Sequence, residues 1–460
     1  MRLFLIHTND SFKYDEYKSL ISTFNDIHIT GIICYGCDKY LDWKPENFGI
    51  PKWEYDQLCY ERSYSEYTPY HVHYDGILSE LLADSRTYFI LERLFSNGGI
   101  DSVFNNMIIL ENVIWNSLSI LYETKPDRIF SSPLDDMTWI FGKAAEFIGV
   151  ETYNLDISPL PYKEWLVKGI DEQVPVSLLN SCPQQNEESL NKINQYILRS
   201  KSSYLEGMPE YEKERMESYN GRFFCIKKEI YEVLNAPNLK RVFYRIYRSI
   251  RKWQILKLYM EHTNNFKFPK KFLVFFLHFQ YERTTLPEGL QFAQQWLAIR
   301  SLAASIPSDW KLVVKEHPST FRYMFIPQVR DTRLYEAISS LPNAIMAPLD
   351  LTPFDLIDRA IVVSTIKGTA GMEAIIRGKP VLVFGLASYR SLKGAFHVKS
   401  INDIKSALQL IDEGFKVSDD DELLKYFKWV DANSYVINSD GFPFEACKTV
   451  IRLPHNPQKR

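Results

Sequence analysis

Long hydrophobic runs, clustered cysteines and an excess of one charge are all missing from this sequence of 460 residues. Its most apolar stretch, 272–279, is shorter than the ~18 residues that cross a bilayer, so we predict no transmembrane helix. The apolar start, 3–6, is too short for the core of a secretory signal and is expected to be a first β-strand. Six cysteines spread over so long a chain predict thiols in a reducing cytoplasm rather than a disulfide framework.

Charge is nearly balanced, with 54 Lys and Arg against 57 Asp and Glu and a net charge of -3. The protein therefore has no net positive charge that would attract nucleic acid, and any contact with a polyanion has to involve a local group of basic residues. The hydrophobic content of 45% is typical of a globular protein. A chain of this length is expected to form two or three domains.

Short apolar runs alternate with helical stretches in two parts of the chain, which predicts an α/β fold with parallel sheets. We predict two Rossmann-like domains, 1–160 and 269–415, that face a central cleft. Between them, 161–268 is expected to be a helical, basic linking region inserted in the fold. The segment 416–460 is expected to form C-terminal helices and a tail.

Small and hydroxylated residues lead from a predicted strand, 360–363, into a predicted helix that starts near Thr369. N–H groups at a helix N-terminus can hold a phosphate, and we expect Glu373, about one turn in, to accept hydrogen bonds from ribose hydroxyls. The alternative is that Thr369 caps the helix and the glycines form a tight turn. The predicted nucleotide-binding residues of this turn are Ser364, Thr365, Gly368 and Thr369.

A second candidate segment, 315–318, follows the predicted strand 312–314. Open α/β sheets place ligands at the carboxyl ends of their strands. A Lys and a His at that position can neutralise a departing phosphate. We therefore predict that Lys315, His317 and Pro318 bind the nucleotide and that His317 is also catalytic, the alternative for a lone His being a structural role.

A third polar segment, 278–289, also leaves the end of a predicted strand. We predict that Gln280 and Arg283 contact the donor or acceptor sugar and that Glu282 is a catalytic carboxylate. The alternative is that Arg283 pairs with Glu288 on a solvated loop.

In the N-terminal half, Asp135 and Asp136 lie between a predicted strand and a predicted helix. Two adjacent acids raise each other's pKa, which suits a general base for an acceptor hydroxyl, although Asp136 is equally suited to cap the helix. Asp10, after the first strand, is expected to touch the acceptor sugar. We predict no metal site and no cofactor.

No acidic residue occurs between Glu232 and Glu261, where basic and aromatic residues alternate along a predicted helix. This segment, 240–257, is expected to contact an anionic membrane surface or an acidic polysaccharide. The alternative is a domain-bridging helix whose aromatic face packs inward.

Three stretches, 278–285, 315–318 and 368–385, resemble bacterial capsule and surface-polysaccharide biosynthesis proteins. These are GT-B glycosyltransferases that include the β-Kdo transferases of capsule assembly. The resemblance implies a GT-B-like transferase that moves a CMP-activated, Kdo-like sugar onto a surface glycan, in the cytoplasm at the inner face of the membrane. It also assigns the phosphate of the CMP-sugar to His317, Ser364 and Thr365. Thr284 stands where β-Kdo transferases carry an Asp nucleophile, for which Glu282 is a substitute.

Three other functions fit the same motifs. A CDP-glycerol-type glycerophosphotransferase and a sugar-nucleotide epimerase share a related two-domain fold. A non-catalytic subunit of a capsule complex, which binds glycan or membrane, would keep the phosphate loop as structure only.

Overall fold

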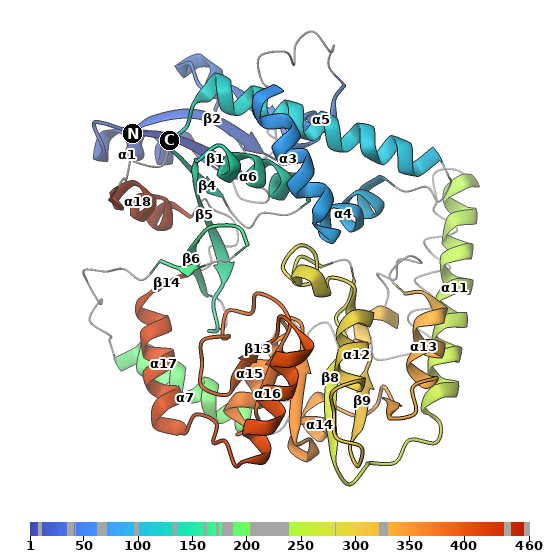
Figure 1. The fold of residues 1–460 in the computed structure, drawn as a ribbon. Coiled ribbons are helices and arrows are strands. Elements are labelled where there is room, and N and C mark those ends of the chain that lie inside the picture. The colour runs from blue at the N-terminus through green and yellow to red at the C-terminus, as the bar shows by residue number, and fades with distance from the viewer. Residues whose placement is uncertain are drawn as a thin grey trace. The chain divides into compact units, whose positions relative to one another are not determined.

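The computed structural model describes residues 1–7, 12–34, 41, 43–61, 71–95, 101–131, 136–160, 163–171, 174–176, 187–202, 239–280, 282–321, 330–436 and 443–454. The chain divides into two units, of which the first comprises Met1–Gln185 and Trp429–Arg460 and the second comprises Asn186–Lys428 (Figure 1). Each unit contains a largely or wholly parallel sheet flanked by helices, so the predicted α/β class with two parallel-sheet domains is confirmed. No helix in the described ranges is long and apolar enough to cross a membrane.

The sheet of the first unit is built from β1 (Arg2–His7), β2 (His28–Cys34), β3 (Lys52–Glu54), β4 (Arg128–Ser131), β5 (Glu151–Ile157), β6 (Lys163–Lys168), β7 (Val174–Pro175) and β14 (Ser434–Val436). Its order is β14-β6-β5-β4-β1-β2-β3, with β7 beside β6. The pairs from β5 through β4, β1 and β2 to β3 are parallel, whereas β6 runs antiparallel to β5. The parallel core therefore ends in an antiparallel edge.

Helices cover both faces of this sheet because the strands are apolar on both sides. Leu3 and Leu5 of β1 pack in one cluster with Leu20 and Val450, whereas Phe4, on the opposite face, stacks on Phe141. The helices of this unit are α1 (Tyr14–Thr23), α3 (His71–Ala83), α4 (Ser85–Phe95), α5 (Asp101–Thr124), α6 (Asp136–Phe147) and α18 (Phe444–Arg452), with 3-10 turns η1 (Pro45–Phe48) and η2 (Tyr55–Cys59).

The sheet of the second unit is wholly parallel. It consists of β8 (Phe272–Phe276), β9 (Lys311–Lys315), β10 (Ala344–Ala347), β11 (Val362–Thr365), β12 (Val381–Val383) and β13 (Ala395–His397), in the order β10-β9-β8-β11-β12-β13. Every residue of β8 is buried, as expected for a central strand covered on both faces.

Helices of the second unit surround this sheet. They are α7 (Glu187–Lys201), α11 (Leu239–Thr263), α12 (Gln295–Ala303), α13 (Thr332–Ser339), α14 (Pro353–Arg359), α15 (Thr369–Ile376) and α16 (Ile401–Asp412), with 3-10 turns η5 (Leu290–Phe292) and η6 (Pro318–Phe321). One core cluster joins Leu273, Phe275 and Leu277 to apolar side chains of α11, α12, α13 and α16. The boundary between the units falls inside α17 (Asp420–Ala432).

Each sheet contains one point where the order of its parallel strands reverses direction. In the second unit the chain runs from β8 through β9 to β10 on one side, and β11 then lies on the other side of β8. In the first unit the same reversal separates β1 from β4. Ligands of open α/β sheets bind beyond the carboxyl ends of the strands at such points, so the loops after β8 and β11 and those after β1 and β4 are the candidate sites.

The loops of the first unit include three predicted site residues. Asp10 and Asp135 lie outside the described residues, as does the side chain of Asp136, the first residue of α6. Their predicted roles as acceptor ligand and general base therefore stay predictions.

The domain boundaries differ from those predicted. Strands β6 and β7, which we placed in the linking region 161–268, belong to the first sheet, and the later part of that region, α7 and α11, belongs to the second unit. The segment 429–460 returns to the first unit. The cause is the antiparallel edge, because strands joined by short connections lack the strand–helix alternation on which the prediction depended.

The prediction of six thiols is also wrong, because Cys34 at the end of β2 is disulfide-bonded. Cys59 and Cys447 are free thiols. Composition argues only against a framework of several disulfides and says nothing about a single bond.

Candidate functional site

Three adjacent strands of the second unit, β9, β8 and β11, end at one edge of their sheet, and the residues that follow them form the candidate site. The main chain already links two of these ends, since the Leu277 N–H donates to the Lys315 carbonyl at 2.9 Å. The side chain of His278, after β8, lies beside the start of α15, after β11, and His317 follows β9.

His278 connects the end of β8 to the end of β11. The Lys367 N–H donates to its Nε2 at 3.3 Å, so Nε2 is the acceptor nitrogen, the Thr365 hydroxyl donates to it at 2.9 Å, and Nδ1 carries the proton. Burial, together with the electrostatic effects of His317 and Arg330, lowers the pKa of His278 to about 3. At physiological pH His278 is therefore a neutral hydrogen-bonding group.

Gly368 is the N-cap residue of α15, so the helix starts without a side-chain cap. A Cβ at this position would lie 2.9 Å from Thr365 Oγ1 and 3.0 Å from His278 Cε1, so only glycine allows the imidazole to approach the helix start so closely. The first N–H groups of α15 and the positive end of its dipole thus lie beside the His278 ring, an arrangement that suits an anion.

His317 lies at the start of the loop after β9, one residue before η6. Its Nδ1 accepts from the Ser319 N–H at 3.2 Å, which places the proton of the neutral ring on Nε2. Its ring centroid is 6.5 Å from that of Phe279.

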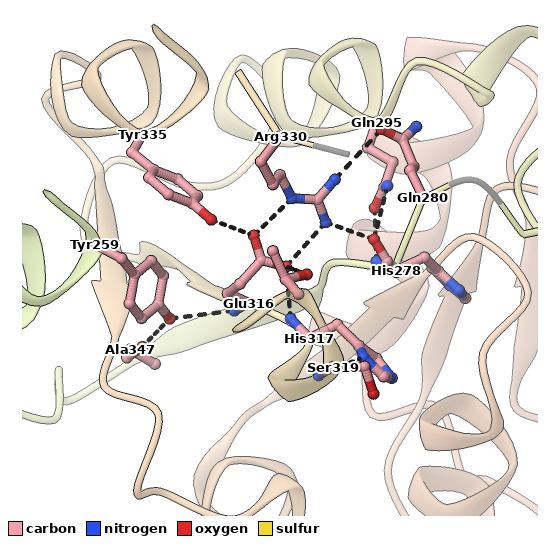
Figure 2. A network of polar contacts seen from close by, with 11 residues as sticks. Tyr259, His278, Gln280, Gln295, Glu316, His317, Ser319, Arg330, Tyr335 and Ala347 are labelled. Atoms are coloured by element: carbon pink, nitrogen blue, oxygen red, sulfur yellow. Dashed lines mark hydrogen bonds and ion pairs between the residues drawn. The ribbon is translucent and has the colours of Figure 1, made fainter. Parts of the chain in front are cut away.

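A buried ion pair holds these two loops together, as Figure 2 shows. The guanidinium of Arg330 donates to Glu316 from Nε at 2.6 Å and from Nη2 at 2.9 Å, and both side chains are at most 1% exposed. Arg330 also donates to the His278 carbonyl and, at 3.3 Å, to Gln280 Oε1. One side chain thus joins the segments that follow β8 and β9.

The remaining oxygen sites of Glu316 are also occupied. The His317 N–H and the Tyr335 hydroxyl each donate to the carboxylate at 2.7 Å, and the Thr320 hydroxyl donates at 3.1 Å. Burial opposes ionisation of this carboxyl, but Arg330 and these donors outweigh it and lower its pKa. Tyr259 of α11 accepts from the Glu316 N–H at 3.2 Å and donates to the Ala347 carbonyl (Figure 2).

The predicted phosphate ligand Lys315 faces a different part of the site. Its Nζ donates to the Pro348 carbonyl at 2.6 Å, and burial lowers its pKa to about 8 while Asp350 opposes that shift. The amine therefore contacts the loop after β10, and none of these contacts involves the α15 start.

The third predicted segment is held by scaffold contacts. Gln280 donates to the Ala293 carbonyl at 3.0 Å, and Arg283 pairs with Glu288 at 2.6 Å, which is the alternative that the sequence left open. The pair is buried rather than solvated, because Glu288 is 2% exposed and its second oxygen accepts from Lys367 at 2.7 Å. Glu282 is exposed and accepts from the Thr284 hydroxyl at 3.3 Å.

The two hydroxyl residues of the predicted phosphate turn lie within β11, which extends two residues beyond the predicted strand. Both are fully buried. Thr365 bonds to His278, and the Ser364 hydroxyl has no partner among the described residues. Thr369 is the first residue of α15 rather than its cap, and its side chain bonds to Glu373, whose pKa is raised by burial to about 7.

Sequence reasoning assigned no role to Glu316 or Arg330, and it did not anticipate that Glu288 also pairs with Lys367. Glu316 lies between Lys315 and His317, which were both predicted site residues. An acid between two basic residues is a signal for a buried counter-charge, and it could have identified Glu316 from the sequence. Arg330 follows no motif, and only the fold brings it to the ends of β8 and β9. Among the described residues, no group of three or more His, Cys, Asp or Glu side chains could hold a metal ion.

Residues 281–399 match the model of a family described as "Capsule polysaccharide biosynthesis protein". The matched range includes His317, β11 and α15 and confirms the resemblance to capsule polysaccharide biosynthesis proteins that the motifs predicted. No curated protein matches the chain.

Several solved structures are similar to this chain at low identity. The Thermosulfurimonas dismutans KpsC β-Kdo 2,7 transferase is 11% identical over 96% of each chain, with a TM-score of 0.31. The β-Kdo 2,4 transferase of the same protein is 12% identical over 66% of this chain and 87% of its own, with a TM-score of 0.29. UDP-GlcNAc 2-epimerase from Neisseria meningitidis is 14% identical over 98% of each chain, with a TM-score of 0.24. At scores this low the superpositions carry no argument about function.

Proposed function

We propose that this protein is a glycosyltransferase that moves a sugar from a nucleotide donor, CMP-activated and Kdo-like, onto a capsule or other surface-polysaccharide acceptor. The observation that supports it is the position of His278 beside the uncapped start of α15, with His317 in the loop after the adjacent strand β9. The family match over 281–399 covers most of this grouping and supports the polysaccharide acceptor.

In this proposal the departing nucleoside phosphate binds at the start of α15. The first N–H groups of the helix, the Nδ1–H of His278 and the Nε2–H of His317 supply hydrogen-bond donors to its oxygens. Preorganised donors of this kind stabilise charge that develops on a leaving group. Glu373 accepts from the ribose hydroxyls, and the carboxylate that moves the acceptor proton or attacks the sugar is Asp136, Asp135 or Glu282.

A panel of nucleotides in a thermal-shift assay tests the donor site first. A nucleotide present at 100 times its Kd stabilises the protein by about 2.7 kcal/mol, and we expect CMP to do so more than UDP or GDP. His317→Ala should then reduce transfer by ~10²–10³ and weaken CMP binding without lowering the melting temperature. Wild-type transfer by this variant would refute the phosphate-site assignment.

Substrate specificity separates the proposed transferase from the other functions. An epimerase would convert its sugar nucleotide with no acceptor present, and a glycerophosphotransferase would consume CDP-glycerol. A non-catalytic subunit would bind glycan without turning over any donor. Product analysis by mass spectrometry, with and without an oligosaccharide acceptor, distinguishes these outcomes.

We also propose that transfer needs no metal ion, since protein donors surround the phosphate position. Activity should persist in EDTA. Loss of transfer in chelator that Mg²⁺ or Mn²⁺ restores would assign Asp135 and Asp136 as metal ligands instead.

A location at the inner face of the membrane completes the proposal, because growing surface glycans are commonly lipid-linked. Its support is the basic and aromatic composition of α11.

A further inference from the structure

Helix α11 has two halves with different surroundings. The C-terminal half is anchored in the second unit, where Ile255 and Tyr259 are fully buried and the helix packs on α13 and β10 (Figure 1). The N-terminal half instead exposes large apolar side chains to solvent. These are Phe243 at 70%, Ile246 at 42%, Tyr247 at 54%, Ile250 at 53% and Trp253 at 63% exposed.

The exposed side chains form a single stripe along the helix. Their spacing of three and four residues places them on one face, and Met260, 44% exposed, continues that face. At 1.5 Å per residue the stripe from Phe243 to Met260 is roughly 26 Å long. Contiguous apolar surface of this kind on a folded protein marks an interaction site.

The charge of α11 indicates what that site binds. The helix contains seven Lys or Arg residues and a single acid, Glu261, whereas the whole chain has a net charge of -3. By helical spacing Lys257 lies within the stripe, with its Nζ 5.6 Å from the centroid of the Trp253 ring, and Arg251 lies beside the stripe's edge, whereas Arg248 and Lys252 lie on the opposite side of the helix. Trp and Tyr beside Lys and Arg are the residues that favour the boundary between lipid headgroups and acyl chains.

We propose that the N-terminal half of α11 docks on an anionic lipid bilayer. The stripe enters the headgroup region, where Lys257 within it and Arg251 beside it contact the lipid phosphates. A second copy of the chain fits this surface less well, because apposing two such helices would bring two sets of seven cations together. Each cation is instead attracted to an anionic bilayer.

The same helix connects the docking surface to the candidate site. Tyr259, two turns after Trp253, contacts the Glu316 N–H, and Glu316 directly precedes His317. Docking through α11 would therefore hold the second unit's site at a fixed position relative to the bilayer. The docking proposal adds to the proposed glycosyl transfer and does not depend on the identity of the donor.

Two sets of substitutions on α11 test the proposal, each with a matched control of exposed residues. The stripe variant combines Tyr247→Ser, Ile250→Ser and Trp253→Ser, and its control carries Ser at Leu198, Leu410 and Val436, which are 66%, 47% and 68% exposed. The charge variant replaces Arg251 and Lys257 by Gln, and its control replaces Lys192 and Lys271 by Gln.

The measurement is flotation of the full chain with vesicles of 3:1 phosphatidylcholine and phosphatidylglycerol, and with phosphatidylcholine alone. We expect the parent and both controls to float with the anionic vesicles and to be released at high salt. Each charge near the surface contributes about fivefold to partitioning, so the charge variant should bind about 25-fold more weakly. The stripe variant should lose binding to a similar degree.

The proposal is overturned if the parent does not float with anionic vesicles or if both α11 variants float as the parent does. It is also overturned if the parent is a dimer by light scattering that the stripe variant converts to a monomer without any vesicle binding. All four variants should keep the CMP thermal shift, so failure of docking is distinguishable from failure of the donor site.

Discussion

Both units bury an arginine against a glutamate, but they do so at opposite ends of their strands. In the first unit, Arg128 opens β4 and is fully buried, with its Nε 3.0 Å from Glu151 Oε2. In the second unit, Arg330 pairs with Glu316 beyond the carboxyl ends of β8 and β9. The same chemical pair therefore lies at the amino ends of the strands in one sheet and at their carboxyl ends in the other, which is where open α/β sheets place ligands.

The partners of each guanidinium show what each pair does. Arg128 donates to the carbonyls of Val450, Leu453 and Pro454 at 2.6, 2.9 and 2.7 Å, so it binds the C-terminal end of α18, where a cation is favoured. Arg330 donates to the His278 carbonyl and to Gln280, and its carboxylate partner accepts from the His317 N–H. Arg128 therefore holds helix α18 in place, whereas Arg330 orients the loops that carry the two histidines of the candidate site.

The largest expected effect comes from removing Arg330 alone. Arg330→Met leaves Glu316 buried without a counter-charge and should lower the free energy of unfolding by about 3–5 kcal/mol. The double variant Glu316→Leu/Arg330→Met should recover most of that loss, because an apolar pair of similar volume replaces both charges. Urea denaturation of the three proteins measures both steps. A double variant as unstable as the single one would show that the pair is needed for folding itself.

Removing Arg128 should have a smaller effect on stability. Arg128→Met should lower the free energy of unfolding by about 3 kcal/mol, because Glu151 is 20% exposed and keeps its contact with Lys168. The control is Arg2→Met at a partly exposed pair with Asp127, where the loss should stay below about 1 kcal/mol. CMP binding by Arg128→Met at 10 °C should equal that of the parent. Weakened binding would contradict the structural role assigned to this arginine.

A pH effect on stability is expected at the ligand-binding edge. The folded state keeps His278 neutral, with a pKa of about 3, whereas in the unfolded chain this group protonates near pH 6.5. The free energy of unfolding therefore decreases as the pH falls below 6.5, because only the unfolded chain takes up this proton. His278→Gln removes this titrating group. The free energy of unfolding of the parent, measured relative to that of the variant, should therefore fall by about 2 kcal/mol between pH 7 and pH 5. Equal pH profiles of the two proteins would show that His278 protonates in the folded state.

The sequence predicted the second unit more fully than the first. Strands such as β8 and β9 are continuous apolar runs followed by polar loops, and helices such as α15 follow glycine. The local sequence pattern was therefore sufficient to predict these elements of the second unit. The short strands β6, β7 and β14 carry no such pattern, since their place at the antiparallel edge depends on pairing between distant segments.

At the candidate site the sequence identified the loops but not the partners within them. His317 and the α15 start were predicted because they follow strands, and a strand end has a known position in a parallel sheet. Arg283 and Gln280 were predicted as sugar ligands, yet they bond to Glu288 and to the main chain at Ala293. Which polar side chains of a loop satisfy one another is decided by tertiary contacts that neighbouring residues in the sequence do not reveal.

Calorimetric titration of CMP into Glu316→Leu/Arg330→Met, beside Arg128→Met and the parent, tests most directly whether the second buried pair serves the candidate site. The double variant should melt within a few degrees of the parent and bind CMP at least about tenfold more weakly, because the loops that carry His278 and His317 lose their shared anchor. Arg128→Met should melt earlier and bind CMP with unchanged affinity. A double variant that binds CMP as tightly as the parent would contradict the account.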